Sequence, residues 1–156
     1  MDTSPPIQPY QQHITVALHH LVTVIDEYAD AWLRNRFNIT FNQYHAIAVL
    51  FDEEPTDVTG LAHCLGVSKA AVSKRLPALA AAGYLSTAAD PHHARRVVIT
   101  LTDQGRRIVE EAAPQLDGMF RDLLAETGIN IGALHADLAT MISTLETKIA
   151  TERTTP

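Results

Sequence analysis

Apolar residues near the start of the chain recur at steps of three and four, the spacing of one face of a helix. They are Ile14, Leu18, Leu21, Ile25, Tyr28 and Trp32, and Ala17, Val24 and Ala31 widen the same face. A similar stripe runs near the end of the chain, through Leu134, Leu138, Ile142, Leu145 and Ile149. Both stretches therefore predict long helices whose apolar faces need a partner.

The next helix is predicted from a capping box. Thr40 stands three residues before Gln43, so each can bond to the backbone N–H of the other, and Pro55 ends the segment. The residues expected in the core are Ala46, Ile47, Val49 and Leu50.

Two shorter helices follow. Asp57 is a suitable N-cap for the first, which ends at Gly66, and Ser68 is a suitable N-cap for the second, which ends at Gly83. Because only the turn LGVS separates them, the pair predicts a helix-turn-helix.

The segments YLSTAA and RVVITL then predict two strands, with Asp90-Pro91 in the turn and a long, flexible tip between them. Thr102 is expected to cap a further helix that contains Pro114, and TGIN breaks that helix before the last one. The order predicts a mostly α fold with a small β wing: a winged helix-turn-helix core flanked by N- and C-terminal dimerisation helices. The expected parts are an N-terminal dimerisation helix in 1–36, the winged helix-turn-helix in 37–108 and C-terminal dimerisation helices in 109–156.

Composition adds a contrast in charge. The chain of 156 residues is 46% hydrophobic and has a net charge of −6, which argues against a protein that coats nucleic acid through bulk charge. Between Val67 and Arg107, however, seven Lys or Arg residues stand against two acidic ones. A basic segment on an acidic protein predicts a local contact with a polyanion. The start, MDTSPPIQPYQQ, lacks the pattern of a secretory signal, and no apolar run is long enough for a membrane helix, so a cytoplasmic location is expected.

The second helix of the pair has two different faces. Val72, Leu76 and Leu79 share the side that would pack inward. The other side is small, polar and cationic, and suits the major groove of DNA. It carries Ala70, Ser73, Lys74 and Pro77, with Lys69 and Arg75 at its flanks. A slight bend at Pro77 is expected, not a break.

The stretch from LGVS through AAGYL to RRVVITLTDQG resembles the core of the MarR family of winged-helix transcriptional regulators. The resemblance implies a homodimer on a pseudo-palindromic double-stranded DNA operator, with a recognition helix in the major groove and a wing near the minor groove. DNA-binding residues are then expected at Ser68, Lys69, Ala70, Ser73, Lys74, Arg75, His93, Arg95 and Arg96. The family's wing usually carries Asp-x-Arg, but here His93 stands at the Asp position before Arg95, unless Asp90 replaces the missing carboxylate.

The resemblance also implies a ligand-responsive repressor. A small aromatic effector would fit where the first helix meets the winged helix, near Tyr28, Trp32, Phe37, Tyr44 and His45, although a plain core is the simpler interpretation of these aromatic residues. No motif predicts an enzyme, a cofactor or a metal site.

Alternatives remain open. The winged helix is also compatible with a protein-interaction module, and a metal- or thiol-responsive regulator is a further possibility. Cys64 lies beside packing residues and is expected to be a buried, inert thiol, with a redox switch as the alternative. His45 and His63 are candidates for an interior histidine, and the adjacent His92 and His93 would point apart on an extended tip.

Overall fold

The computed structural model describes residues 13–154, apart from the side chains of residues 94, 95, 153 and 154. In chain order the elements are α1 (Ile14–Phe37), α2 (Phe41–Glu53), β1 (Thr56–Asp57), α3 (Val58–Leu65), α4 (Lys69–Ala81), β2 (Leu85–Asp90), β3 (His93–Leu101), α5 (Asp103–Glu126) and α6 (Ile131–Thr154). The predicted mostly helical fold with a winged helix-turn-helix is confirmed.

The described chain divides into two compact units. The first extends to Ala112 and contains α1, the winged helix and the start of α5, and the second begins at Ala113 and contains the rest of α5 and α6. Helix α5 continues through Pro114.

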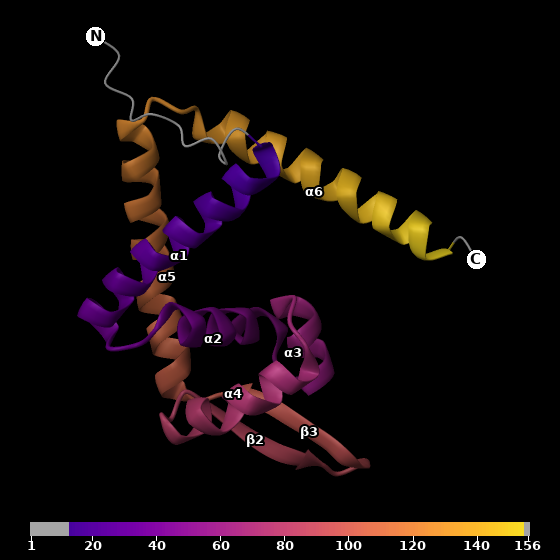
Figure 1. Ribbon diagram of the computed structural model, residues 1–156. Helices are drawn as coiled ribbons and strands as arrows, with labels where there is room; N and C mark the ends of the chain where they lie inside the picture. Colours follow the sequence, from indigo (N-terminus) through magenta and orange to yellow (C-terminus); the bar gives the residue numbers. More distant parts are fainter. Residues whose placement is uncertain (1–12, 155–156) are drawn as a thin grey trace. The chain divides into compact units, whose positions relative to one another are not determined.

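Helices α2, α3 and α4 pack in sequence and contact the hairpin of β2 and β3, as Figure 1 shows. The core of this unit, to which α1 also contributes, is formed by large side chains that are almost completely buried: Leu33, Ile39, Ile47, Leu50, Leu61, Val72 and Ile99. Of the core residues predicted for α2, only Val49 is half-buried, and the other three are buried.

The sheet has three antiparallel strands in the order β1-β3-β2. The sequence predicted β2 and β3 but not β1, which is two residues long and pairs Thr56 with Ile99 and Asp57 with Val98. A strand this short carries no alternation of polar and apolar residues, so only its pairing with β3 defines it.

The expected long, flexible tip of the hairpin is wrong. Strand β2 continues to Asp90 and β3 begins at His93, so only Pro91 and His92 form the turn. The backbone N–H of His92 donates to Asp90 Oδ1 at 2.8 Å, which closes the turn locally. The pairing is irregular just behind it, where Ala89 faces Val97 but Asp90 faces His93.

The predicted helix caps are confirmed. The Thr40–Gln43 capping box is present, Asp57 accepts a bond from the N–H of Gly60, and Ser68 accepts one from Ala71. Gly66 ends α3 with a φ of 65°, in the left-handed region that favours glycine.

Gly105, in the first turn of α5, is needed for a close approach. A Cβ atom there would lie 2.0 Å from the carbonyl oxygen of Tyr84, just before β2. Only glycine lets α5 start this close to the hairpin.

Candidate nucleic-acid interface

Helix α4 presents the two faces that its sequence predicts. Val72, Leu76 and Leu79 are buried against the rest of the winged helix. Ala70, Ser73, Lys74 and Pro77 are exposed, as are Ser68 and Lys69 at the start of the helix. The exposed face is therefore free to enter a groove about as wide as the major groove of B-DNA.

Pro77 lies within α4 without ending it, since the helix continues to Ala81. Proline has no N–H, so the carbonyl of Ser73 one turn earlier lacks the usual helical bond. Because Ser73 and Pro77 are both exposed, water can satisfy that carbonyl. This agrees with the prediction that Pro77 does not break the helix.

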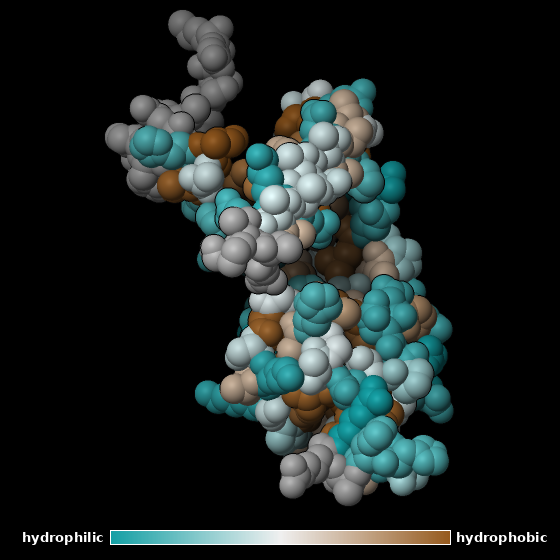
Figure 2. All heavy atoms as spheres, turned by 90° about the vertical axis from the view of Figure 1, so that its right-hand side faces the viewer, coloured by the Kyte–Doolittle hydropathy of each residue, from teal (hydrophilic) through white to brown (hydrophobic). Residues whose placement is uncertain are grey.

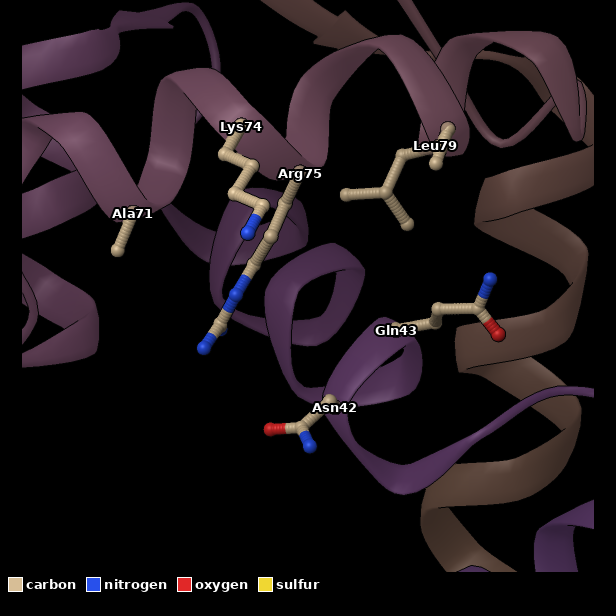
Figure 3. Close-up of a pocket in the computed structure, with 7 residues that line it drawn as sticks. Asn42, Gln43, Ala71, Lys74, Arg75 and Leu79 are labelled. Carbon is tan, nitrogen blue, oxygen red and sulfur yellow. The ribbon is translucent and has the colours of Figure 1, made fainter.

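A hollow of about 460 Å³ lies between α4 and the first turn of α2. Its lining residues are Asn42, Gln43, Ala71, Lys74, Arg75, Ala78 and Leu79. In Figure 3 the Lys74 and Arg75 side chains both extend from α4 toward α2, where Asn42 is labelled.

The hollow is cationic and contains no acidic lining residue. Within residues 13–154, no carboxylate pairs with Lys74 or Arg75 at ion-pair distance. Two cations without a facing carboxylate, beside amide groups, can donate hydrogen bonds to the oxygens of a phosphate. The sequence predicted Lys74 and Arg75 but missed Asn42, because Asn42 lies on another helix and no local pattern connects it to α4.

Helix α3 carries two side chains whose burial the sequence misjudged. Leu61 and Ala62 are buried, but Cys64 and His63 are exposed. The expectation of a buried thiol at Cys64 is therefore wrong, as is that of an interior His63. In a helix of eight residues that packs on one side, neighbours of a buried residue can still face solvent.

Arg96 makes the main side-chain contacts of the wing. Its Nε donates to Asp57 Oδ2 at 2.8 Å, and its Nη1 lies 3.7 Å from Asp90 Oδ2. Asp90 therefore faces Arg96. The side chain of Arg95 lies outside the described residues, so its predicted role stays a prediction.

His93 is exposed at the start of β3. With Asp57, Val58, Thr59, Arg96 and Val97 it lines a second hollow, of about 370 Å³. The structure thus brings His93 close to Arg96 and to the start of α3.

Asp57 joins two contacts. Its Oδ1 accepts the backbone N–H of Gly60 at 2.9 Å, and its Oδ2 accepts the bond from Arg96. The Gly60 N–H, followed by the Arg96 guanidinium, holds the pKa of the Asp57 carboxyl below its ordinary value against the opposing effect of partial burial. The carboxylate is therefore the stable form of Asp57 near neutral pH.

A second carboxylate links α2, β3 and α5. Glu54, just after α2, accepts the backbone N–H of Leu101 at 2.6 Å and pairs with Arg106. The Arg106 guanidinium also lies 5.4 Å from the ring centroid of Phe51. Sequence reasoning missed this contact, because Glu54 and Arg106 are 52 positions apart.

The aromatic residues predicted for an effector site fall into separate contacts. Trp32 and Phe37 have ring centroids 5.6 Å apart, and the Arg36 guanidinium lies 4.9 Å from the Trp32 ring. Tyr44 is buried, and burial raises the pKa of its hydroxyl, whereas Tyr28 is exposed.

His45 is exposed and stacks on Phe41 with ring centroids 5.6 Å apart, so the expectation that it is interior is wrong. Among the described residues, no three His, Cys, Asp or Glu side chains gather closely enough to hold a metal ion. Nor does any helix of residues 13–154 have the length and apolar character needed to cross a membrane.

Residues 37–96 match the model of the MarR family. The chain is 26% identical over 116 residues to the organic hydroperoxide resistance transcriptional regulator of Bacillus subtilis (strain 168), covering 74% of this chain and 78% of that protein. It is 40% identical over 73 residues to the transcriptional regulator AdcR of Streptococcus pneumoniae, covering 47% of this chain and 49% of AdcR, so the match spans about half of that relative.

Solved structures support the fold. A MarR/EmrR family transcriptional regulator from Acinetobacter sp. ADP1 aligns with a TM-score of 0.78 at 22% identity, covering 92% of this chain and 99% of that one. MepR of S. aureus, solved in a complex with DNA, aligns with a TM-score of 0.73 at 23% identity, covering 85% of this chain and 98% of that one. The predicted resemblance to the MarR family is confirmed.

Proposed function

We propose that the chain is a sequence-specific double-stranded DNA-binding regulator, because residues 37–96 match the model of the MarR family. It acts as a homodimer on a pseudo-palindromic operator, as a ligand-responsive repressor without enzymatic activity, in the cytoplasm. The observation that carries the proposal is the exposed face of α4, where Ser73 and Lys74 stand free on a helix whose other face is buried.

Contacts to DNA are assigned by chemistry. Ser73 and Lys74 can donate to base edges or phosphates, and the methyl group of Ala70 can contact thymine. Ser68, Lys69 and Arg75 at the edges of α4 contact phosphates, and His93 and Arg95 of the wing reach toward the minor groove.

The cationic hollow extends the phosphate contacts beyond α4. Lys74 and Arg75 line it together with Asn42 of α2, so a backbone phosphate held there touches two helices at once. Such a contact fixes the angle at which α4 enters the groove without carrying sequence information.

Dimerisation is assigned to the two ends of the chain, residues 1–36 and 109–156, with DNA binding in 37–108. The support is apolar surface that a lone chain leaves in water. Figure 2 shows apolar residues interspersed with hydrophilic ones on the surface that it draws. The exposed apolar residues of α1 are Ile14, Val16, Leu21, Val22, Val24 and Tyr28, and those of α6 are Leu138, Met141, Ile142, Leu145 and Ile149. In the dimer that the family resemblance implies, these faces would cover one another.

A small aromatic effector would shift the population between dimers that can and cannot bind DNA, by its different affinity for the two. The Trp32–Phe37 ring pair with its neighbouring Arg36 guanidinium supports such a site, because an aromatic acid can stack on the rings and pair with the cation. Tyr28, Tyr44 and His45 complete the proposed effector site.

The decisive experiment is selection of bound sequences from a random pool of double-stranded DNA. The expected product is an inverted repeat whose half-site centres lie about one helical turn, roughly 10 base pairs, apart. Affinity for the selected site should fall steeply with salt, because several phosphates are contacted.

Two variants of α4 distinguish a contact to a base from a contact to a phosphate. Ser73→Ala should relax preference at one position of each half-site, and Lys74→Ala should reduce the salt slope by about one per subunit if it contacts a phosphate. Arg121→Ala is the control, since it removes an exposed cation of α5 that lies outside both the α4 face and the apolar stripe of α6, and it should leave both unchanged. A wild-type protein that cannot distinguish any selected site from random DNA at about 0.15 M salt would contradict the proposal.

A further inference from the structure

The wing contacts the helix-turn-helix at its base, where β1 pairs with β3, and along β2, which contacts α4. Strand β1 pairs with β3 only at Val98 and Ile99, and α3 begins directly after β1. The outer part of β3, from His93 to Val97, extends beyond this pairing. Something other than the strand ladder must therefore hold that outer part against α3 if the wing is to keep a fixed position.

Arg96 makes that connection. Its guanidinium lies between Asp57 at the start of α3, 2.8 Å away, and Asp90 at the tip of the wing, 3.7 Å away. The irregular pairing behind Asp90 displaces residues 94–96 from the regular ladder, and a local kink of this kind can re-aim a side chain.

The partners of Arg96 are themselves fixed. Asp57 caps α3 through its other oxygen, by the bond from Gly60, and Asp90 accepts the N–H of His92 in the tip turn. The side chains of Asp57 and Asp90 are 23% and 12% exposed, against 49% for Arg96. One guanidinium thus links two carboxylates that are each already held by backbone.

This arrangement conflicts with the DNA contact that the sequence predicted for Arg96. A guanidinium facing two carboxylates presents no net positive charge to a phosphate, unlike Lys74 and Arg75, whose hollow contains no acidic residue. Releasing Arg96 to DNA would leave Asp57 and Asp90 unpaired near the DNA backbone, where like charges repel.

We propose that Arg96 is a positioning residue: by pairing with Asp57 and Asp90 it fixes the wing to the start of α3, and so sets the place of the wing relative to the recognition helix. Helix α3 packs directly on α4, so a wing tied to α3 is also tied to α4. This role rests on the proposed function for its effect on DNA binding, but the connection itself exists without DNA.

The first test uses the full chain without DNA. Hydrogen exchange of the wing amides is compared in the wild type, Arg96→Gln, Asp57→Ser and the double variant. Serine is an effective N-cap, so Asp57→Ser removes the ion pair while it keeps the cap of α3. Each single variant should exchange faster in residues 86–97 by about two- to fivefold, the range that an exposed ion pair supports, and the double variant should exchange no faster than either.

The second test measures affinity for the selected operator across salt concentrations. Arg96→Gln and Asp57→Ser should weaken binding by similar factors, less than multiplicatively in the double variant, with an unchanged salt slope. Arg96→Lys should restore part of the affinity, because lysine can still pair with Asp57. Arg121→Gln, which breaks the 2.8 Å pair with Asp117 on α5, is the charge-matched control and should alter neither measurement.

Two results would overturn the inference: wing exchange that is unchanged in both single variants, or an Arg96→Gln salt slope lower by about one while Asp57→Ser binds at least as tightly as the wild type. The second would make Arg96 a phosphate contact that Asp57 restrains. If the wild type selects no DNA at all, the proposed function fails, and the exchange measurement still decides whether Arg96 holds the wing.

Discussion

Replacing Ile142 by alanine tests whether the apolar face of α6 forms the dimer interface. Ile142 is 56% exposed and lies on the same stripe as Leu138, Leu145 and Ile149, which are also exposed. Because its side chain contributes little to the packing of the lone chain, its removal should change assembly far more than folding.

The magnitude follows from the exposed fraction. Isoleucine has three carbons more than alanine, and each buried CH₂ group is worth about 0.8 kcal/mol. Scaled by the 56% that is exposed, the loss on association is about 1.3 kcal/mol per subunit. A symmetric interface contains the residue twice, so the dimer loses about 2.6 kcal/mol, a rise of roughly 80-fold in the dimer dissociation constant.

Sedimentation equilibrium over a range of protein concentrations measures that constant directly. Thr140→Ala is the matched control, since Thr140 lies about 160° around α6 from Ile142 on a helical wheel and should leave the dissociation constant unchanged. The reasoning is refuted if Ile142→Ala and the wild type associate equally, or if Thr140→Ala weakens the dimer as much as Ile142→Ala does.

Three further predictions follow from single contacts. The pKa of Asp30 is lowered chiefly by Arg34, and the pKa of Asp57 is lowered chiefly by the Gly60 N–H. The stability that these carboxylates contribute is therefore complete above about pH 4 and is lost as the pH falls through the lowered pKa values. In urea unfolding, the free energy of unfolding of Asp57→Asn should fall less steeply with decreasing pH than that of the wild type, and parallel curves would contradict this. Gly105→Ala should lower the thermal midpoint by several degrees, because its Cβ would meet the Tyr84 carbonyl at 2.0 Å, whereas Gly118→Ala, with open space around its Cβ, should not. The exposed thiol of Cys64 should react with a thiol reagent in the native protein, and a reaction that requires denaturant would show that the thiol is covered.

The helices of this protein could be predicted because local rules determine them. A capping box needs only Thr40 and Gln43, and an N-cap needs only Asp57 or Ser68 ahead of a helical stretch. The faces of α4 follow from the same periodicity, so the buried Val72 and the exposed Lys74 were both predicted.

Features that depend on distant residues were missed or misjudged. Strand β1 exists only through its pairing with β3, and the partner of Glu54 lies 52 positions away on α5. The exposure of Cys64 depends on which side of α3 the other helices cover, and neighbouring leucines in the sequence do not decide it. In the wing, strand propensity predicted strands that were too short and a tip that was too long. Cross-strand pairing carries β2 and β3 closer to the turn than their β-branched residues alone suggest.

The two wing arginines show why a pattern of charges does not assign a role. In the sequence Arg95 and Arg96 are adjacent and equal in charge, and both were assigned to DNA. What separates them is whether carboxylates face the guanidinium, and one of the two that face Arg96 stands 39 positions earlier, in a residue chosen by a local rule to cap α3. The cap is determined by the residues next to it and the ion pair by the register of β1 on β3, so only the folded sheet brings them together. An arginine in a wing should therefore be counted as a DNA contact only after the partners that the sheet register gives it are known.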